Sequence, residues 1–114
     1  MVESPASDPI AAIGAARSWL FVPGDRPERF EKAAASGADV VICDFEDSVT
    51  ADAKDAARAA VSRWLRGGGA AAVRVNPVGT PWHDADIAAL RGAAGLRAIV
   101  LPKSQDTAEI SDVA

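Results

Sequence analysis

Short apolar runs alternate along this chain with longer segments whose apolar residues recur at three- and four-residue steps. The apolar runs cover residues 18–22, 39–43, 71–75 and 97–101, and each is followed by proline, aspartate or asparagine. Runs of this length predict β-strands, and a run that does not alternate with polar residues is typical of a strand covered on both faces. We therefore expect four buried strands.

The segments between these runs carry helix signals. Asp25 is placed to cap a first helix that ends at Gly37, and residues 53–65 repeat apolar positions at helical spacing. Thr80 is placed to cap a third helix, and Ser104 a fourth that begins near the end of the sequence. Strands that alternate with helices in this way predict a parallel sheet with right-handed crossovers.

The length of the repeat indicates the fold class. Eight units of roughly 20–30 residues would give the ~200–250 residues of a closed (β/α)8 barrel, whereas this chain has 114 residues. We expect an α/β fold in which residues 17–114 form the N-terminal half of a TIM-barrel domain, with about four βα units, after a flexible lead-in over residues 1–16. A small open four-stranded sheet is the alternative. Four βα units would leave strands one and four as open edges, which favour pairing with another chain, so we expect a homo-oligomer.

Charge and cysteine content narrow the classes of function. The net charge is −4, and nucleic-acid or membrane-surface binding would need a basic face. No apolar run approaches the ~18 residues that span a bilayer, and the first residues lack the positive charge of a signal peptide. Cys43 is the only cysteine and cannot form an internal disulfide, so we expect a cytoplasmic protein with no nucleic-acid or membrane partner.

Three of the predicted strands end in chemically useful residues. Phe21-Val22-Pro23-Gly24 forms a rigid turn, Asp44-Phe45-Glu46-Asp47 groups carboxylates, and Val73-Arg74-Val75-Asn76 contains an arginine. In β/α folds, the loops at the carboxyl ends of the strands converge on one site. We therefore expect these residues to face a common site.

Five segments, residues 17–30, 37–49, 73–76, 79–82 and 99–103, together resemble the citrate lyase beta-subunit-like family, also called the HpcH/HpaI aldolase family. The resemblance implies a (β/α)8 barrel that makes or breaks a carbon–carbon bond next to a thioester or keto group. It also implies Mg²⁺, with acyl-CoA thioesters of the citryl-, malyl- or citramalyl-CoA type and a small oxoacid as substrates.

The same resemblance locates the metal. A typical family member has two direct Mg²⁺ ligands, a glutamate and an aspartate, on strands five and six. These ligands are expected beyond Ala114, so this chain would hold no direct metal ligand. We accordingly expect the isolated chain to be inactive.

Arg74 is the strongest catalytic candidate. Cleavage of a carbon–carbon bond beside a thioester leaves an enolate, and a fixed cation that binds this charge more tightly as it develops lowers the barrier. The resemblance implies this role for the arginine on strand three. The alternative is an arginine that pairs with Asp44 or Glu46 and only neutralises the end of the sheet.

Glu46 and Asp47 follow the second strand. Mg²⁺ prefers oxygen ligands and keeps part of its water shell, and the resemblance favours contacts from these two carboxylates to metal-bound water. The alternatives are carboxylates that favour a helix N-terminus, or a salt bridge to Lys54.

The remaining expected substrate contacts are Phe21, Pro23, Gly24, Arg26, Asn76 and Lys103. The glycine lets the backbone approach a ligand closely. Arg26 and Arg29 lie at the start of a helix, where anions are favoured, and could bind coenzyme A phosphates. The alternative is an exposed surface arginine, which we prefer for Arg29. Asn76 is expected to shape its loop, and Lys103 to contact ligand or to form a salt bridge.

These observations predict a Mg²⁺-dependent carbon–carbon lyase or synthase that acts on acyl-CoA. Two alternatives stay open. One is a non-catalytic half-barrel that self-associates through its open strand edges, and the other is a pyruvate-type aldolase that uses free oxoacids without coenzyme A.

Overall fold

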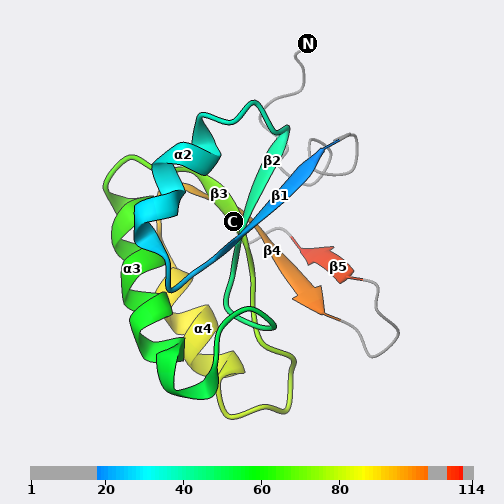
Figure 1. The fold of residues 1–114 in the computed structure, drawn as a ribbon. Coiled ribbons are helices and arrows are strands. Elements are labelled where there is room, and N and C mark those ends of the chain that lie inside the picture. The colour runs from blue at the N-terminus through cyan, green and yellow to red at the C-terminus, as the bar shows by residue number, and fades with distance from the viewer. Residues whose placement is uncertain (1–17, 103–107, 112–114) are drawn as a thin grey trace.

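Five strands form one sheet in the computed structural model, which describes residues 18–102 and the backbone of residues 108–111 (Figure 1). The strands are β1 (Trp19–Pro23), β2 (Val40–Asp44), β3 (Ala71–Arg74), β4 (Leu96–Pro102) and β5 (Ala108–Ser111). They neighbour one another in chain order. The first four are parallel, as predicted, and β5 is antiparallel to β4.

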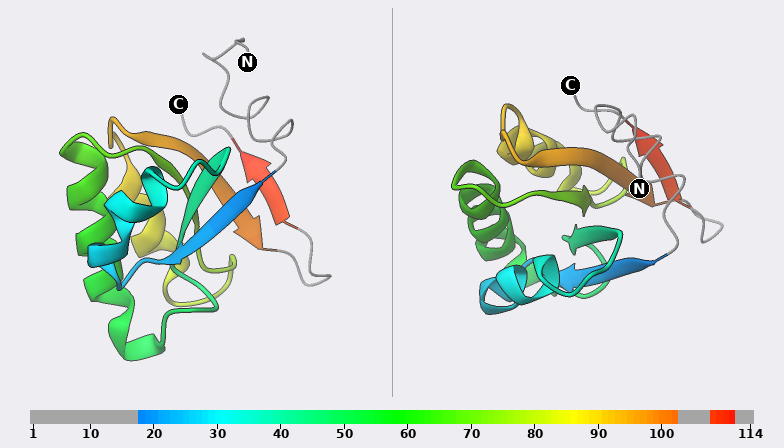
Figure 2. Two further views of the ribbon diagram at one scale, coloured as in Figure 1. Left: turned by 45° about the horizontal axis from the view of Figure 1, so that its top comes forward. Right: turned by 90° about the horizontal axis from the view of Figure 1, so that it is seen from above.

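Three helices connect the parallel strands. They are α2 (Phe30–Ala34), α3 (Lys54–Arg66) and α4 (His83–Leu90), and short 3-10 turns, η1 (Pro27–Arg29) and η2 (Ala51–Ala53), precede the first two. The helices gather on one side of the sheet, away from β5 (Figure 2). Within the part of the chain that the structure describes, no helix has the length and apolar character needed to cross a membrane.

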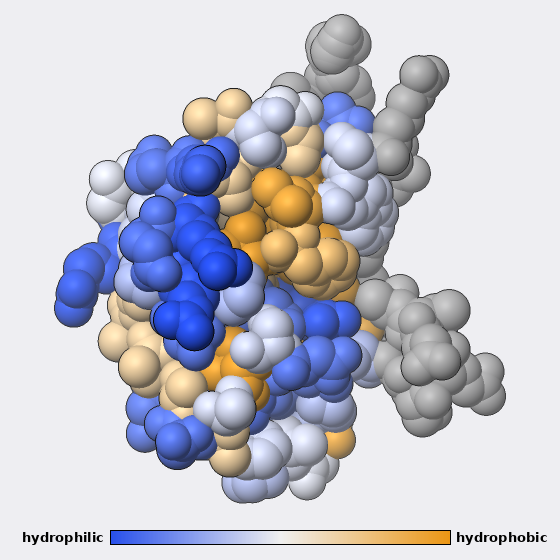
Figure 3. All heavy atoms as spheres, viewed as in Figure 1, coloured by the Kyte–Doolittle hydropathy of each residue, from blue (hydrophilic) through white to orange (hydrophobic). Residues whose placement is uncertain are grey.

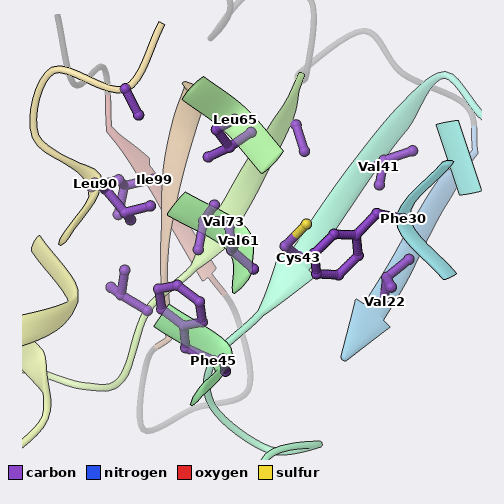
Figure 4. Close-up of a cluster of buried hydrophobic side chains, with 14 of the residues drawn as sticks. Val22, Phe30, Val41, Cys43, Phe45, Val61, Leu65, Val73, Leu90 and Ile99 are labelled. Atoms are coloured by element: carbon purple, nitrogen blue, oxygen red, sulfur yellow. The ribbon is translucent and has the colours of Figure 1, made fainter. Parts of the chain in front are cut away.

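The core lies between the sheet and the helices (Figure 4). Alternate strand residues face the helices, because successive side chains of a strand point to opposite faces. Val22, Cys43, Val73 and Ile99 from the strands pack in one cluster with Phe30, Val61, Leu65 and Leu90 from the helices. A second, smaller cluster of Ile42, Ala72, Ala98 and Val100 lies on the opposite face. Both faces of β2 and β3 are therefore buried, as their continuous apolar runs predict.

The first strand is not buried, contrary to the prediction. Trp19, Leu20 and Phe21 are 40%, 36% and 43% exposed, and only Val22 is buried at 4% exposure. The reason is the position of β1, which pairs with β2 along one edge and has no other neighbour among the described strands. An apolar run predicts a strand, but it does not reveal whether that strand lies at the edge.

Two predicted helix caps are also wrong. The N-cap position of η1 is occupied by Arg26, without a side-chain cap, and Asp25 Oδ1 is buried without a hydrogen-bond partner. The hydroxyl of Thr80 donates to the carbonyl of Pro77 at 2.7 Å, and α4 begins only at His83. In both places a tight turn precedes the helix and places the expected cap residue outside it.

The C-terminal part departs most from the prediction. In place of a fourth helix, the backbone of β5 pairs with β4 from Pro102↔Ala108 to Ile99↔Ser111. Ser104, the expected cap, lies outside the described residues. A parallel edge strand presents unpaired N–H and C=O groups, and β5 satisfies those of β4. The described chain thus holds three βα units and a fourth parallel strand, and β4 is not an open edge.

Candidate functional site

The carboxyl ends of β1, β2 and β3 bring the predicted residues together. The register aligns Pro23 with Asp44, and Asp44 with Arg74. Since Val22, Cys43 and Val73 face the helices, alternation places Phe21, Asp44 and Arg74 on the opposite face of the sheet. Two strands that are 30 residues apart in sequence thereby contribute an aspartate and an arginine to one site.

Asp44 is the centre of this site. Its Oδ1 accepts hydrogen bonds from the Glu46 amide at 2.9 Å and from Arg74 Nε at 2.8 Å. Its Oδ2 accepts from the Ser48 amide at 3.0 Å, the Ser48 hydroxyl at 2.7 Å and Arg74 Nη2 at 3.0 Å. The side chain is 1% exposed. A buried carboxylate with this many donors is fixed in place and stays ionised.

Arg74 is held on one edge and on one face. The paired bonds to Asp44 use the Nε/Nη2 edge of the guanidinium. The Phe21 ring lies 4.7 Å from its Cζ atom, which is within the range of a cation–π contact. Among the described residues, Nη1 makes no hydrogen bond. Arg74 therefore does pair with Asp44, as the alternative interpretation expected, and still has donors available.

Two further carboxylates lie beside Arg74. Glu46 Oε1 is 3.5 Å from Nε, and Asp47 Oδ2 is 3.8 Å from Nη2. Glu46 is 21% exposed and Asp47 is 76% exposed. One guanidinium thus faces three carboxylates, so the local charge is negative.

The pKa values follow from this arrangement. Burial disfavours the charged form of Asp44, but the Arg74 guanidinium and the hydrogen bonds from Ser48 and Glu46 lower its pKa below the ordinary value. The hydrogen bond to Asp44 raises the pKa of Arg74. Burial and the neighbouring charge of Asp47 raise the pKa of Glu46. Glu46 therefore gains a proton more readily than an ordinary glutamate, whereas Asp44 gains one less readily than an ordinary aspartate.

The described side chains alone support neither a cysteine nucleophile nor a directly bound metal ion. Burial, followed by the charge of Asp44, raises the pKa of Cys43 to about 12, so its thiol is a packing group and not a nucleophile. Across residues 18–102, no three side chains of histidine, cysteine, aspartate or glutamate are grouped so that they could hold a metal ion.

Lys54 has a role that the sequence did not indicate. Its ammonium is buried and donates to the carbonyls of Phe45, Glu46 and Val49 at 2.7, 3.1 and 3.0 Å. The Trp82 ring lies 4.9 Å from the Nζ atom. Lys54 therefore binds the main chain of the loop after β2, and its predicted salt bridge to the carboxylates is not formed. The sequence gives no sign that three carbonyl groups converge on this cation, because the contacts depend on how the loop after β2 folds.

Asn76 belongs to a different cluster. Its amide N and its Nδ2 donate to Asp86 Oδ2 at 2.8 and 2.7 Å, and Arg58 Nε donates to Asp86 Oδ1 at 2.7 Å. His83 Nδ1 lies 2.8 Å from the Asn76 carbonyl oxygen. Asn76 and Asp86 are 1% and 0% exposed. Asn76 thus shapes the loop after β3, as expected, and its contact with substrate stays a prediction.

Gly24 lies against the protein itself. Its amide donates to the Asp44 carbonyl at 2.8 Å. A Cβ atom at this position would lie 2.8 Å from the same oxygen and 3.1 Å from the Phe45 ring. The close approach for which the sequence predicted a glycine is therefore made to β2, and contact of Pro23 and Gly24 with substrate stays a prediction.

An open groove of about 350 Å³ runs between β1 and α2. Leu20, Phe21 and Pro23 line it together with the cationic side chains of Arg29 and Lys32. On the surface, apolar side chains gather next to hydrophilic ones in this region (Figure 3). Arg29, one of the two arginines considered for coenzyme A phosphates, lines the groove, and so does Lys32. Contact of Arg26 with coenzyme A stays a prediction. Lys103 lies outside the described residues.

The sequence of the whole described region matches one protein family. The model of the HpcH/HpaI aldolase/citrate lyase family matches residues 17–114, which include every residue of the site described above. The chain belongs to this family. The resemblance seen in the five sequence segments is thereby confirmed.

Several members of the HpcH/HpaI family are closely similar to this chain. The citrate lyase subunit beta-like protein of Mycobacterium tuberculosis is 45% identical over 96 residues, which are 84% of this chain and 34% of that protein. The L-malyl-CoA/beta-methylmalyl-CoA lyase of Cereibacter sphaeroides is 41% identical over 100 residues, 82% of this chain and 31% of that protein. The chain thus spans about a third of the length of these relatives.

A solved structure of a family member shows the same fold. The protein CitE of M. tuberculosis, in complex with magnesium, acetoacetate and coenzyme A, matches with a TM-score of 0.66 and 47% identity. The match covers 79% of this chain and 33% of that one. The family is one of lyases of the citrate lyase and malyl-CoA lyase type, and its solved members include complexes with magnesium and coenzyme A.

Proposed function

We propose that this chain supplies the first strands of a (β/α)8 barrel that cleaves or forms a carbon–carbon bond in an acyl-CoA thioester. The substrates would be of the citryl-, malyl- or citramalyl-CoA type, with a small oxoacid as the second product or reactant. Arg74 is the proposed catalytic residue. Membership of the lyase family supports the class of reaction, and the site geometry supports the choice of residue.

The observation that carries the proposal is the Arg74 guanidinium at the carboxyl end of β3. It is 21% exposed, held by Asp44 at 2.8 and 3.0 Å, and covered on one face by Phe21. A cation that is fixed before the reaction stabilises developing negative charge without reorganising. An arginine whose only role was to neutralise the carboxylates at the strand ends would not need unbonded N–H donors.

The proposed reaction is a retro-aldol type cleavage. The substrate hydroxyl gives its proton to solvent, the oxygen forms a carbonyl, and the bond between the two carbon atoms breaks. Its electron pair moves into the thioester, which becomes an enolate and then takes up a proton at carbon. Arg74 donates hydrogen bonds to the oxygen on which this charge develops, and these hydrogen bonds strengthen as the carbon–carbon bond breaks.

The charge around Arg74 fits a divalent cation. Three carboxylates surround one guanidinium, and an anionic substrate would be repelled unless a further positive charge were present. Glu46 and Asp47 are proposed to bind water on Mg²⁺, with the direct ligands outside the described residues. When bound, Mg²⁺ would polarise the oxygen atoms of the substrate.

Coenzyme A is proposed to lie in the groove between β1 and α2. Arg29 and Lys32 offer the positive charge that its phosphates need, and the apolar lining suits its thiol-bearing arm. Phe21 lines this groove and also covers Arg74. A thioester that passed from the groove over the free edge of β1 would therefore reach the guanidinium. This arrangement favours the thioester over the free oxoacid of a pyruvate-type aldolase.

Native mass spectrometry of the 114-residue chain with acetyl-CoA and Mg²⁺ tests the proposed function. We expect one acetyl-CoA for each chain, and loss of most binding in Lys32→Glu. Arg63→Glu, on the exposed surface of α3, is the matched control and should bind normally. Equal binding by both variants, or no binding by the unmodified chain, would contradict the proposal.

Self-association is a second candidate property, and the open edge of β1 favours it. This edge has no neighbour among the described strands, and Leu20 and Phe21 are exposed. Unpaired strand edges bind other strands. Light scattering on the purified chain decides the question: a dimer that Leu20→Lys converts to a monomer supports edge pairing, and a monomer at all concentrations excludes it.

A further inference from the structure

We propose that Asp44 and Phe21 are positioning residues that make Arg74 present only the terminal edge of its guanidinium to substrate. This inference rests on the proposed function and deepens it, because it specifies how the anionic group of the substrate would be bound. It assigns a role to two residues that surround the candidate catalytic residue without reacting themselves.

A guanidinium has two edges that can each donate two parallel hydrogen bonds. One edge is formed by Nε and one Nη atom, and the other by the two Nη atoms. In this site Asp44 accepts from Nε and Nη2 at 2.8 and 3.0 Å. The Nε edge is therefore occupied before any ligand arrives, and only the terminal Nη1/Nη2 edge is left.

The faces of the guanidinium are also unequal. The Phe21 ring lies 4.7 Å from Cζ and covers one face. Phe21 is on the edge strand and is 43% exposed, so burial of its ring in a core does not explain its position. A ring in contact with the cation instead restricts rotation of the planar group.

The strand register reinforces this arrangement. Asp44 and Arg74 are direct partners in the pairing of β2 with β3, and Asp44 is itself held by the Ser48 amide and hydroxyl. The Gly24 amide binds the Asp44 carbonyl at 2.8 Å. The guanidinium is therefore oriented by three strands together.

The single unbound edge of the Arg74 guanidinium restricts the chemical class of ligand. A carboxylate or enolate oxygen must approach in the guanidinium plane from its terminal end. Asp47 Oδ2 lies 3.8 Å from Nη2. A compact, small anion such as an oxoacid carboxylate fits this approach. Binding along the Nε side would require Asp44 to leave.

Nuclear magnetic resonance of the ¹⁵N-labelled 114-residue chain tests the positioning without any ligand. The measured quantity is the rate of rotation about the Nε–Cζ bond of Arg74, whose signal is assigned by its loss in Arg74→Lys. Arg58, bound to Asp86 and Asp55, is the internal standard for a restrained guanidinium, and exposed Arg63 is the standard for a mobile one. We expect Arg74 to match Arg58; a rate equal to that of Arg63 would overturn the proposal.

Two variants separate positioning from folding. Asp44→Asn should increase the rotation rate at least about tenfold, since a hydrogen bond to a charged group is worth more than the free energy of a tenfold change. Phe21→Leu replaces an exposed residue and should increase the rate while leaving the melting temperature unchanged. Asp84→Asn, an exposed position on α4, is the matched control and should change neither. Unchanged rotation in both Asp44→Asn and Phe21→Leu would refute the role of these residues.

A second arm adds acetoacetate and Mg²⁺ to the same labelled chain. Larger shifts at the Nη atoms than at Nε support binding through the terminal edge, and larger shifts at Nε contradict it. A restrained guanidinium that shows no shift at saturating acetoacetate would leave the positioning intact and would count against the proposed function.

Discussion

Two aspartate–arginine pairs in this molecule are built from the same parts and differ in what they leave free. In both, a buried aspartate accepts from the Nε atom of an arginine, at 2.8 Å for Asp44–Arg74 and 2.7 Å for Asp86–Arg58. The aspartates are 1% and 0% exposed. The first pair lies at the carboxyl ends of the strands, on the face opposite the helices, and the second joins α3 to α4.

The two pairs differ in the exposure and the partners of their arginines. Arg58 is 11% exposed, and its guanidinium binds two carboxylates, Asp86 through Nε and Asp55 through Nη1. Arg74 is 21% exposed, and both of its hydrogen bonds go to the single carboxylate of Asp44. Asp47 Oδ2 lies 3.8 Å from Nη2, which is too long for a hydrogen bond. A guanidinium bound between two carboxylates joins elements of the fold, whereas one bound along a single edge at a strand end can offer its other edge to a ligand. The variants below test this contrast.

Removal of Asp86 should have the largest effect on stability. Asp86→Ala leaves the Asn76 amide, its Nδ2 and the Arg58 guanidinium without their acceptor at a site with no exposure. We expect a loss of about 4 kcal/mol, the usual cost of breaking a buried charged pair. Urea unfolding measures this loss of stability. A loss smaller than that of Asp44→Asn would contradict the view that the Asp86 pair contributes more to stability than the Asp44 pair.

Asp44→Asn should cost less, about 2–3 kcal/mol, because Arg74 can turn toward solvent and Ser48 can still donate. The cost should also depend on pH. Since the pKa of Asp44 is lower in the folded chain than its ordinary 3.8, its ionised form stabilises the fold above that pH. This stabilisation is lost as the pH falls through the lowered pKa.

Urea unfolding between neutral and strongly acidic pH checks the sign. The unmodified chain should lose more stability on acidification than Asp44→Asn does. Parallel curves for the two proteins would show that Asp44 is not the group responsible.

Gly24→Ala should disturb the first pair selectively. The added Cβ would lie 2.8 Å from the Asp44 carbonyl oxygen and 3.1 Å from the Phe45 ring, so the backbone of β2 must shift. Overpacking of this kind costs about 1–3 kcal/mol. The added Cβ would also lie 3.2 Å from the Cβ of Ala57, the chain neighbour of Arg58. We therefore expect the Arg74 signal to move further in the spectrum than the Arg58 signal. The open position Gly37 is a poor control because its φ is +90°, so Ala34→Gly on the exposed surface of α2 serves as the reference for a stability loss distant from Asp44.

Phe21→Leu should have the smallest effect on stability, within about 0.5 kcal/mol, since the side chain is 43% exposed. Its effect should instead appear in the mobility of Arg74, whose face it covers. A melting curve and a rotation rate measured on the same sample separate the two effects. A large loss of stability would assign Phe21 to the core and not to the site.

The sequence predicted the parallel strands and the main components of the site for a simple physical reason. Strand ends are marked by a change from apolar residues to turn residues, and parallel strands place their carboxyl ends together. Asp44 and Arg74 could therefore be expected at one edge, and the register confirms it. Their bidentate pairing, with the spare donors of Arg74, depends on side-chain rotamers and could not be predicted.

Long-range partners explain the other differences. Asp86 looks like an ordinary first-turn carboxylate of a helix, but its partners come from a strand end and a neighbouring helix. Lys54 looks like a surface cation, but three carbonyls of one loop converge on it. The pairing of β5 with β4 and the exposure of β1 depend on position within the sheet, which a local pattern of residues does not encode.

The central claim is that Arg74 binds the anionic group of a substrate. Calorimetric titration of acetoacetate tests it at saturating Mg²⁺, which Glu46 and Asp47 are proposed to hold through its water shell. The three proteins are the unmodified chain, Arg74→Lys and the exposed control Arg63→Lys. Lysine keeps the charge but lacks the planar fork of donors. The account predicts saturable binding to the unmodified chain and to the control, weakened at least about tenfold in Arg74→Lys. Equal affinity in all three proteins would contradict it.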